Sequence, residues 1–247
     1  VYNQKVELPV DITAKKAAEG FALKGEDFAF TLKGTGVSQT KSNDAQGNVK
    51  FDTITFEVRS DDKATGNNTI VIKPDRFTDD KYTAEYTIAE TAGNNAFLTY
   101  DGTEYKATVT VTRTPRSDVE GLYTYAAAVA YGNATNTPPT NTPPTFTNSW
   151  KKAPARIIKK VLDSDGKPYD TNETFKIDIT YTYPADYTGD TTQFPASVSL
   201  NKANGFTATI NDLPYNTVVA VNEADSKGMT PSYDPASKQI TVDGTST

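Results

Sequence analysis

Val10-Asp11-Ile12-Thr13-Ala14-Lys15-Lys16, close to the start of the chain, alternates apolar and polar side chains. Residues two apart share one face of a β-strand, so this alternation predicts a strand with one buried face. Lys16 falls in phase with the apolar positions of that face, which are Val10, Ile12 and Ala14. We therefore expect the Lys16 amine to point into the core. A register shift of one residue would instead turn Lys15 inward.

The same period of two recurs further along the chain. Phe28-Ala29-Phe30-Thr31-Leu32 and Tyr86-Thr87-Ile88-Ala89-Glu90 both alternate in this way, and Glu90 is in phase with Tyr86 and Ile88. The composition agrees, because 14 Tyr and 11 Phe accompany one Trp and one Met, and aromatic and β-branched residues favour strands. We predict an all-β fold in which Glu90 also faces the core. A solvated glutamate at a strand end is the plainer alternative.

A second set of segments repeats the first. Pro154-Ala155-Arg156-Ile157-Ile158-Lys159-Lys160, Phe175-Lys176-Ile177-Asp178-Ile179 and Val219-Ala220-Val221-Asn222-Glu223 follow in the same order, with lysine ending the first segment and glutamate the last. Such internal repetition indicates tandem domains of one type. We place the first domain at residues 1–150 and the second at 151–247, and we expect each to be an Ig-like β-sandwich.

The inward lysine of the second domain is either Lys159 or Lys160. We expect Lys160, because Val161 and a turn over Asp163–Pro168 follow it directly. Only a short stretch of chain follows Glu223. We therefore expect the second domain to lack its closing strand within this chain.

A proline-rich run lies near the end of the first domain. Residues 132–145 read GNATNTPPTNTPPT, and proline cannot donate a hydrogen bond to a β-ladder. We expect this run to form an exposed loop before Phe146-Thr147-Asn148 returns to the sheet.

The residue types that are missing narrow the chemistry. The chain has no cysteine and no histidine, which excludes disulfides, thiolate catalysis and the Ser-His and Cys-His pairs of many hydrolases. The net charge of −6 argues against binding to nucleic-acid phosphates, and no apolar run is long enough to cross a bilayer. We expect no cofactor and no metal. Asp163-Ser164-Asp165-Gly166 is interpreted as a turn, because its glycine comes too early for a calcium-binding EF-hand loop.

Several short motifs follow one another in a specific order. The first domain carries Lys16-x-x-x-Gly20-x-x-Leu23, Phe28-x-Phe30-x-Leu32, Tyr86-x-Ile88-x-Glu90, Tyr100-Asp101 and Phe146-Thr147-Asn148. The second carries Lys160-Val161-x-Asp163-x-Asp165-Gly166-Lys167-Pro168, Leu213-Pro214 and Val219-x-Val221-x-Glu223. The first set resembles the pilin isopeptide-linkage domains of Gram-positive surface pili. The second is similar to the B-type (CnaB-like) repeats of collagen-adhesin stalks.

The resemblance implies an intramolecular amide, or isopeptide, bond that forms without another enzyme and releases ammonia. Carried over by position, Lys16 is the nucleophile, Asn148 is the electrophile and Glu90 assists the proton transfer. In the second domain Lys160 and Glu223 match, whereas the partner asparagine is not in the chain. Apart from this single turnover, the resemblance implies no enzymatic activity.

The resemblance also implies a structural role outside the cell. The chain is expected to be a pilus shaft subunit or a segment of an adhesin stalk, attached to the cell wall of a Gram-positive bacterium. Its expected partners are other pilin or adhesin domains in a covalent polymer or tandem array.

The bond can also be rationalised from elementary chemistry. An amine attacks only when it is unprotonated, and burial lowers the pKa of a lysine. A buried glutamic acid in its neutral form would hydrogen-bond the Asn148 carbonyl oxygen and pass protons to the leaving nitrogen. Folding would hold the reacting groups together, which supplies the effective molarity that amide exchange requires.

Two other classes of function compete with this interpretation. A ligand-binding adhesin would contact a host glycan or matrix protein through loops such as 132–145 and 182–194. A carboxylate-pair glycosidase would need two acids facing a groove, and the sequence shows no sign of such a pair. Within the bonding hypothesis, Asn136 and Asn141 are rival acceptors in the proline-rich run.

Overall fold

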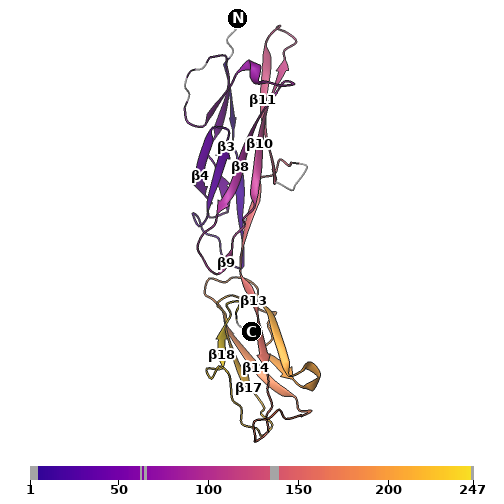
Figure 1. Ribbon diagram of the computed structural model, residues 1–247. Coiled ribbons are helices and arrows are strands. Elements are labelled where there is room, and N and C mark those ends of the chain that lie inside the picture. The colour runs from indigo at the N-terminus through magenta and orange to yellow at the C-terminus, as the bar shows by residue number, and fades with distance from the viewer. Residues whose placement is uncertain (1–4, 62, 64–65, 134–138, 246–247) are drawn as a thin grey trace. The chain divides into compact units, whose positions relative to one another are not determined.

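The computed structural model describes residues 5–61, 63, 66–133 and 139–245. The described residues are mostly β-strands (Figure 1), which confirms the all-β fold. The chain divides into two compact units. Domain 1 holds the residues up to Ala18, Leu23–Asn94 and Tyr100–Asn148, and domain 2 holds Glu19–Ala22, Asn95–Thr99 and the residues from Ser149 onward.

The first part of the chain forms strands whose ladders include antiparallel pairs, such as β8 with β10 and β3 with β8, and the parallel pair of β6 with β7. The strands are β1 (Val6–Val10), β2 (Thr13–Glu19), β3 (Ala29–Gly34), β4 (Val37–Ser42), β5 (Asn48–Lys50), β6 (Ile54–Val58), β7 (Thr69–Ile72), β8 (Lys81–Thr91), β9 (Leu98–Thr99), β10 (Glu104–Pro115), β11 (Tyr123–Asn133) and β12 (Thr145–Trp150). A short 3₁₀ helix, η1 (Pro74–Arg76), precedes β8.

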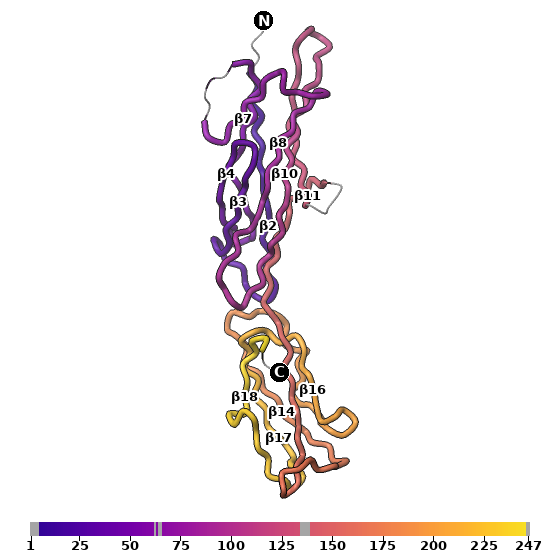
Figure 2. Tube along the Cα trace, viewed as in Figure 1, coloured from indigo at the N-terminus to yellow at the C-terminus, as the bar shows by residue number. Residues whose placement is uncertain are grey.

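Three sheets result from this pairing among the described residues. Their strand orders are β1-β6-β7, β11-β10-β8-β3-β4 and β5-β2-β12-β9. The traces of β3, β4, β8 and β10 can be followed side by side in Figure 2. The order of the third sheet makes β2 and β12 hydrogen-bonded neighbours, although they lie at opposite ends of domain 1 in the sequence.

The core of domain 1 is built by the alternation that the sequence shows. Ile12, directly before β2, and Phe146 of β12 are fully buried, and so are Phe30 of β3 and Ile88 of β8. The rings of Phe30 and Phe146 lie 5.3 Å apart between centroids, so side chains of two different sheets meet in one core. Aromatic pairs at this separation add to the stabilisation from buried apolar area.

The proline-rich run begins later than we predicted. Gly132 and Asn133 are the last residues of β11, and Thr140 forms an isolated bridge with Tyr131. Residues 134–138 lie outside the described part of the chain. The return at Thr145 agrees with the prediction that Phe146-Thr147-Asn148 re-enters the sheet.

Domain 2 is a smaller arrangement of two sheets in the described residues. Its strands are β13 (Lys152–Ile158), β14 (Phe175–Thr182), β15 (Ser197–Leu200), β16 (Thr207–Pro214), β17 (Val218–Glu223) and β18 (Gln239–Thr241), with the 3₁₀ helix η2 (Lys202–Asn204) before β16. One sheet pairs β13 with β16, and the other has the order β15-β14-β17-β18. Ala155, Ile179, Leu213 and Val219 are among the residues of its core. Nowhere in the part of the chain that the structure describes is there a helix with the length and apolarity needed to cross a membrane.

Candidate functional site

Three polar side chains converge in the core of domain 1. Lys16 lies on β2, Asn148 on the neighbouring strand β12, and Glu90 near the end of β8 in the facing sheet. Each is in phase with the buried apolar residues of its own strand, as alternation requires. Lys16 is 4% exposed and Asn148 0% exposed, and the Glu90 side chain is 0% exposed. Lys15, the alternative to Lys16, is exposed.

Glu90 bridges the other two residues with its two carboxylate oxygens. Lys16 Nζ donates a hydrogen bond to Glu90 Oε2 at 2.7 Å, and Asn148 Nδ2 donates one to Glu90 Oε1 at 2.6 Å. The carboxylate therefore stands between the amine that would attack and the nitrogen that would leave. The fold thus brings Lys16 and Asn148, which lie 74 and 58 positions from Glu90 along the chain, to the same carboxylate.

The surroundings of Lys16 favour the neutral amine. Its Nζ lies 4.6 Å from the centroid of the Phe28 ring. Burial lowers the pKa of Lys16, and the hydrogen bond and charge of Glu90, together with the charge of Asp101, offset this effect only in part. A buried amine with a lowered pKa is a competent nucleophile.

The contact of Glu90 with Asn148 differs from our expectation. We predicted a hydrogen bond from Glu90 to the Asn148 carbonyl oxygen, but Glu90 contacts the amide nitrogen. The carbonyl oxygen, Oδ1, instead accepts the backbone N–H of Asp101 at 2.8 Å. A carboxylate on one side and an N–H donor on the other leave the side-chain amide one favourable orientation. No signal in the sequence pointed to the Asp101 main chain as a partner of Asn148.

Domain 2 contains a similar pair, but with a different lysine from the one we predicted. Lys159 Nζ donates a hydrogen bond to Glu223 Oε2 at 2.9 Å and lies 2.8 Å from Oε1. Lys160 is exposed, so our choice of Lys160 was wrong. Buried Ala153, Ala155 and Val161 share the phase of Lys159, and strict application of the alternation would have found it.

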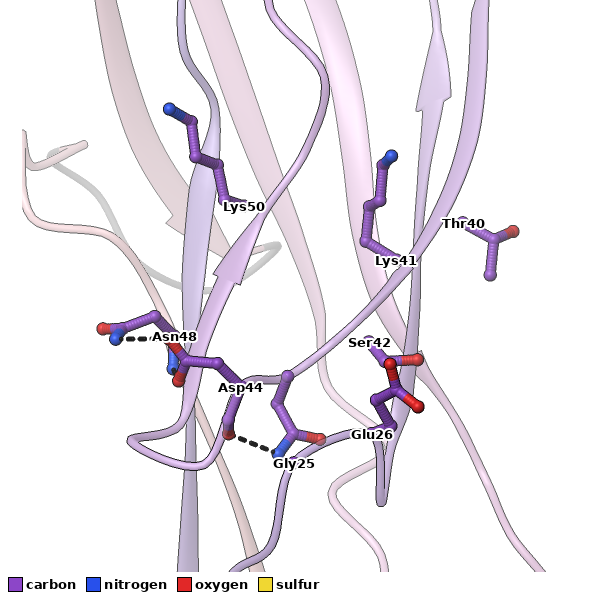
Figure 3. Close-up of a pocket in the computed structure, with 9 residues that line it drawn as sticks. Gly25, Glu26, Thr40, Lys41, Ser42, Asp44, Asn48 and Lys50 are labelled. Carbon is purple, nitrogen blue, oxygen red and sulfur yellow. Dashed lines mark hydrogen bonds between the residues drawn. The ribbon is translucent and has the colours of Figure 1, made fainter.

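The rival acceptors do not enter the site. Asn141 is exposed, and Asn136 lies outside the described residues. A surface hollow of domain 1, lined by Glu26, Lys41, Asp44 and Lys50 among others, contains none of the three core residues (Figure 3). It is an open, charged surface, whereas the candidate chemistry is in the closed core.

The arrangement suits an acyl transfer between side chains. It provides an amine with a lowered pKa, a carboxamide whose oxygen is held by an N–H donor, and a carboxylate in contact with both nitrogens. These are the roles of nucleophile, polarised electrophile and proton relay. The site needs neither a metal nor a cofactor for this reaction.

The matches among solved structures include two streptococcal major pilins and one repeat of a staphylococcal surface protein. The major pilin T3.2 of Streptococcus pyogenes is 15% identical, with 95% of this chain and 93% of that chain covered and a TM-score of 0.43. Another S. pyogenes major pilin is 17% identical, with 88% and 83% covered and a TM-score of 0.40. A single B repeat of the collagen-binding surface protein of Staphylococcus aureus is 14% identical, with 91% and 90% covered and a TM-score of 0.22. The alternative of a ligand-binding adhesin gains no support from these matches.

A search of curated proteins found no match. The family model described as "FctA: Spy0128-like isopeptide containing domain" matches residues 12–151. This range is more than half of the chain and includes Lys16, Glu90 and Asn148. The chain therefore belongs to the family of Spy0128-like isopeptide-containing domains.

Proposed function

We propose that the chain is a structural subunit of a surface pilus or stalk in which domain 1 joins β2 to β12 by a covalent amide between Lys16 and Asn148. The observation that supports this most directly is the bridging position of Glu90, which contacts the Lys16 amine and the Asn148 amide nitrogen at 2.7 and 2.6 Å. The family match adds that related domains contain an isopeptide.

The reaction balances without an outside reagent. The neutral Lys16 amine attacks Cγ of Asn148, and a bond forms between Lys16 Nζ and that carbon. The bond from Cγ to Nδ2 breaks, and one proton passes from Lys16 through Glu90 to the leaving nitrogen. The products are a secondary amide and ammonia. Folding does the catalytic work once, because it places the groups in contact inside a dry core.

The bond would change how domain 1 carries tension. It would close a loop of about 130 residues, which on the chain-entropy argument used for disulfides stabilises the fold by roughly 5 kcal/mol. Because β2 and β12 are neighbours in one sheet, force entering near one end would leave through the bond without peeling the strands between them. Such a link also resists reduction, unlike a disulfide.

The experiment is an intact mass of the purified, folded chain. Each amide formed expels one ammonia, so the measured mass should lie about 17 Da below that of the unmodified sequence. Lys16→Ala, Asn148→Ala and Glu90→Ala should each restore the full mass. Lys15→Ala and Asn141→Ala are matched controls, since both residues are exposed, and both should keep the loss. A wild-type chain of full mass would refute the proposed bond.

Domain 2 contains half of the same constellation. Lys159 Nζ lies 2.8 and 2.9 Å from the two Glu223 carboxylate oxygens, and no described asparagine donates to that carboxylate as Asn148 does to Glu90. We assign Lys159 and Glu223 as the lysine and glutamate of a second bond whose carboxamide is not among the described residues. The chain should therefore lose one ammonia and not two, and a second loss would overturn this assignment.

A further inference from the structure

Asp101 both donates a hydrogen bond to β12 and accepts one from it. It lies between β9 and β10, and its backbone N–H donates to Asn148 Oδ1 at 2.8 Å. Its carboxylate accepts in return, because Thr147 N–H donates to Asp101 Oδ2 at 2.9 Å. Asp101 therefore contacts the reacting side chain and the backbone of the residue before it.

The other carboxylate oxygen of Asp101 holds its own loop. Thr103 N–H donates to Asp101 Oδ1 at 3.0 Å, which fixes the turn into β10. Burial tends to raise the pKa of Asp101, but the hydrogen bonds from Thr103 and Thr147 and the charge of Lys16 outweigh it and lower the pKa. Asp101 thus stays ionised as an acceptor.

The contact with Asn148 Oδ1 has a chemical meaning. As an amine adds to Cγ, negative charge collects on Oδ1, and an N–H donor already in place stabilises that charge without reorganisation. Such a donor must be rigid, since a displacement of about 1 Å can cost roughly 100-fold in rate.

We propose that the Asp101 backbone N–H is the oxyanion donor of amide formation and that the Asp101 carboxylate is a positioning group, which holds this N–H against Asn148 through Thr103 and Thr147. The inference rests on the proposed Lys16–Asn148 bond. It adds a fourth residue whose side chain acts through its hydrogen bonds and does not touch the reacting atoms.

The test follows bond formation from the moment of synthesis. The full chain is made by cell-free translation, quenched in acid at intervals, and the fraction lacking ammonia is read from the intact mass. Asp101→Ala should react at least ~10-fold more slowly than wild type, because the donor loses its support, yet in the end lose the same single ammonia. Asp101→Asn should be intermediate, since its side-chain oxygen can still accept one N–H. Asp163→Ala is the matched control, because the exposed Asp163 also accepts two loop N–H groups, from Asp165 and Lys167, but belongs to domain 2.

A pH profile separates this role from a merely structural one. The charges facing Lys16 come from Glu90 and Asp101, so removing the Asp101 charge should move the midpoint of the rate to lower pH. Asp163→Ala should leave rate and midpoint unchanged. If Asp101→Ala does not fold by circular dichroism, the rate and midpoint of Asp101→Asn decide. Wild-type rates in the Asp101 variants would overturn this inference alone, whereas a wild-type chain that never loses ammonia would overturn the proposed bond itself.

Discussion

Domain 1 and domain 2 each contain a lysine-glutamate ion pair, but the two pairs differ in their exposure to solvent. In both, the lysine lies over a phenylalanine ring, at 4.6 Å for Lys16 and Phe28 and at 4.7 Å for Lys159 and Phe175. The Lys16 and Glu90 side chains are 0% exposed, whereas Lys159 is 15% and Glu223 4% exposed. The ion pair is therefore present in both domains, but it is fully buried only in domain 1.

The difference comes from the strand beside the lysine. In domain 1, β2 lies between β5 and β12, and β12 supplies the asparagine that occupies Glu90 Oε1. In domain 2, β13 pairs only with β16 among the described residues, and no described asparagine donates to Glu223, whose two carboxylate oxygens both lie within 2.9 Å of Lys159 Nζ. A buried ion pair contributes little stability by itself. We infer that the pair becomes reactive when a neighbouring strand brings a carboxamide into contact with the carboxylate.

The largest expected contrast between the domains is mechanical. In a single-molecule pulling experiment on the wild-type chain, domain 2 should unfold and extend, while the segment between Lys16 and Asn148 should not. Asn148→Ala should release that segment and add about 450 Å of extension, since about 130 extended residues become available. Asn141→Ala should behave as wild type. A wild-type trace that already contains this extension would show that the domains do not differ in the proposed way.

The next contrast is thermodynamic. Asn148→Ala should lower the free energy of unfolding of domain 1 by about 5 kcal/mol, because the unfolded chain is no longer cross-linked. Domain 2 should keep its own transition, since Asn148 is not part of it. Guanidinium unfolding followed by circular dichroism would measure both transitions. A shift of less than about 1 kcal/mol in domain 1 would contradict a covalent link.

A smaller contrast distinguishes the two adjacent lysines of domain 2. Lys159→Ala should destabilise domain 2 by about 1–3 kcal/mol, because the buried Glu223 carboxylate loses its partner. Lys160→Ala should change its stability by no more than about 0.5 kcal/mol, as expected for an exposed side chain. Urea unfolding of the two variants would measure the difference. Equal effects would mean that Lys159 is not the inward lysine.

The smallest expected effect is a pH dependence that appears only without the bond. Asn148→Ala keeps a free Lys16 whose pKa is lower in the folded state than in the unfolded state because of burial. The unfolded chain then binds more protons, so stability should rise with pH up to the ordinary lysine value of 10.5 and level off above it. The double variant Lys16→Ala with Asn148→Ala is the control, because its pH dependence comes from the other titrating groups alone. Parallel curves for the two variants would show that Lys16 is not desolvated.

Much of domain 1 could be predicted because alternation is a local property. The phase of Val10 to Lys16 and of Tyr86 to Glu90 required only that residues two apart share a face, and both charged groups are indeed buried in the structure. The prediction for domain 2 was wrong because this rule was not applied strictly there. In domain 2 the proximity of Val161 favoured Lys160, whereas the phase from Ala153 onward leads to Lys159.

The sequence by itself determined an all-β chain, two related segments, and a lysine and a glutamate that face a core without any cysteine or histidine nearby. Only the tertiary structure decided that β12 lies beside β2, that the Asn148 amide turns its nitrogen to Glu90, and that Asp101 holds its oxygen. The reason is physical: side-chain phase depends on neighbours two residues away. Amide orientation, by contrast, depends on hydrogen bonds between residues 47 and 58 positions apart, and the order of β2 and β12 on contacts such as that of Lys15 N–H with the Pro144 carbonyl. No local pattern records these contacts.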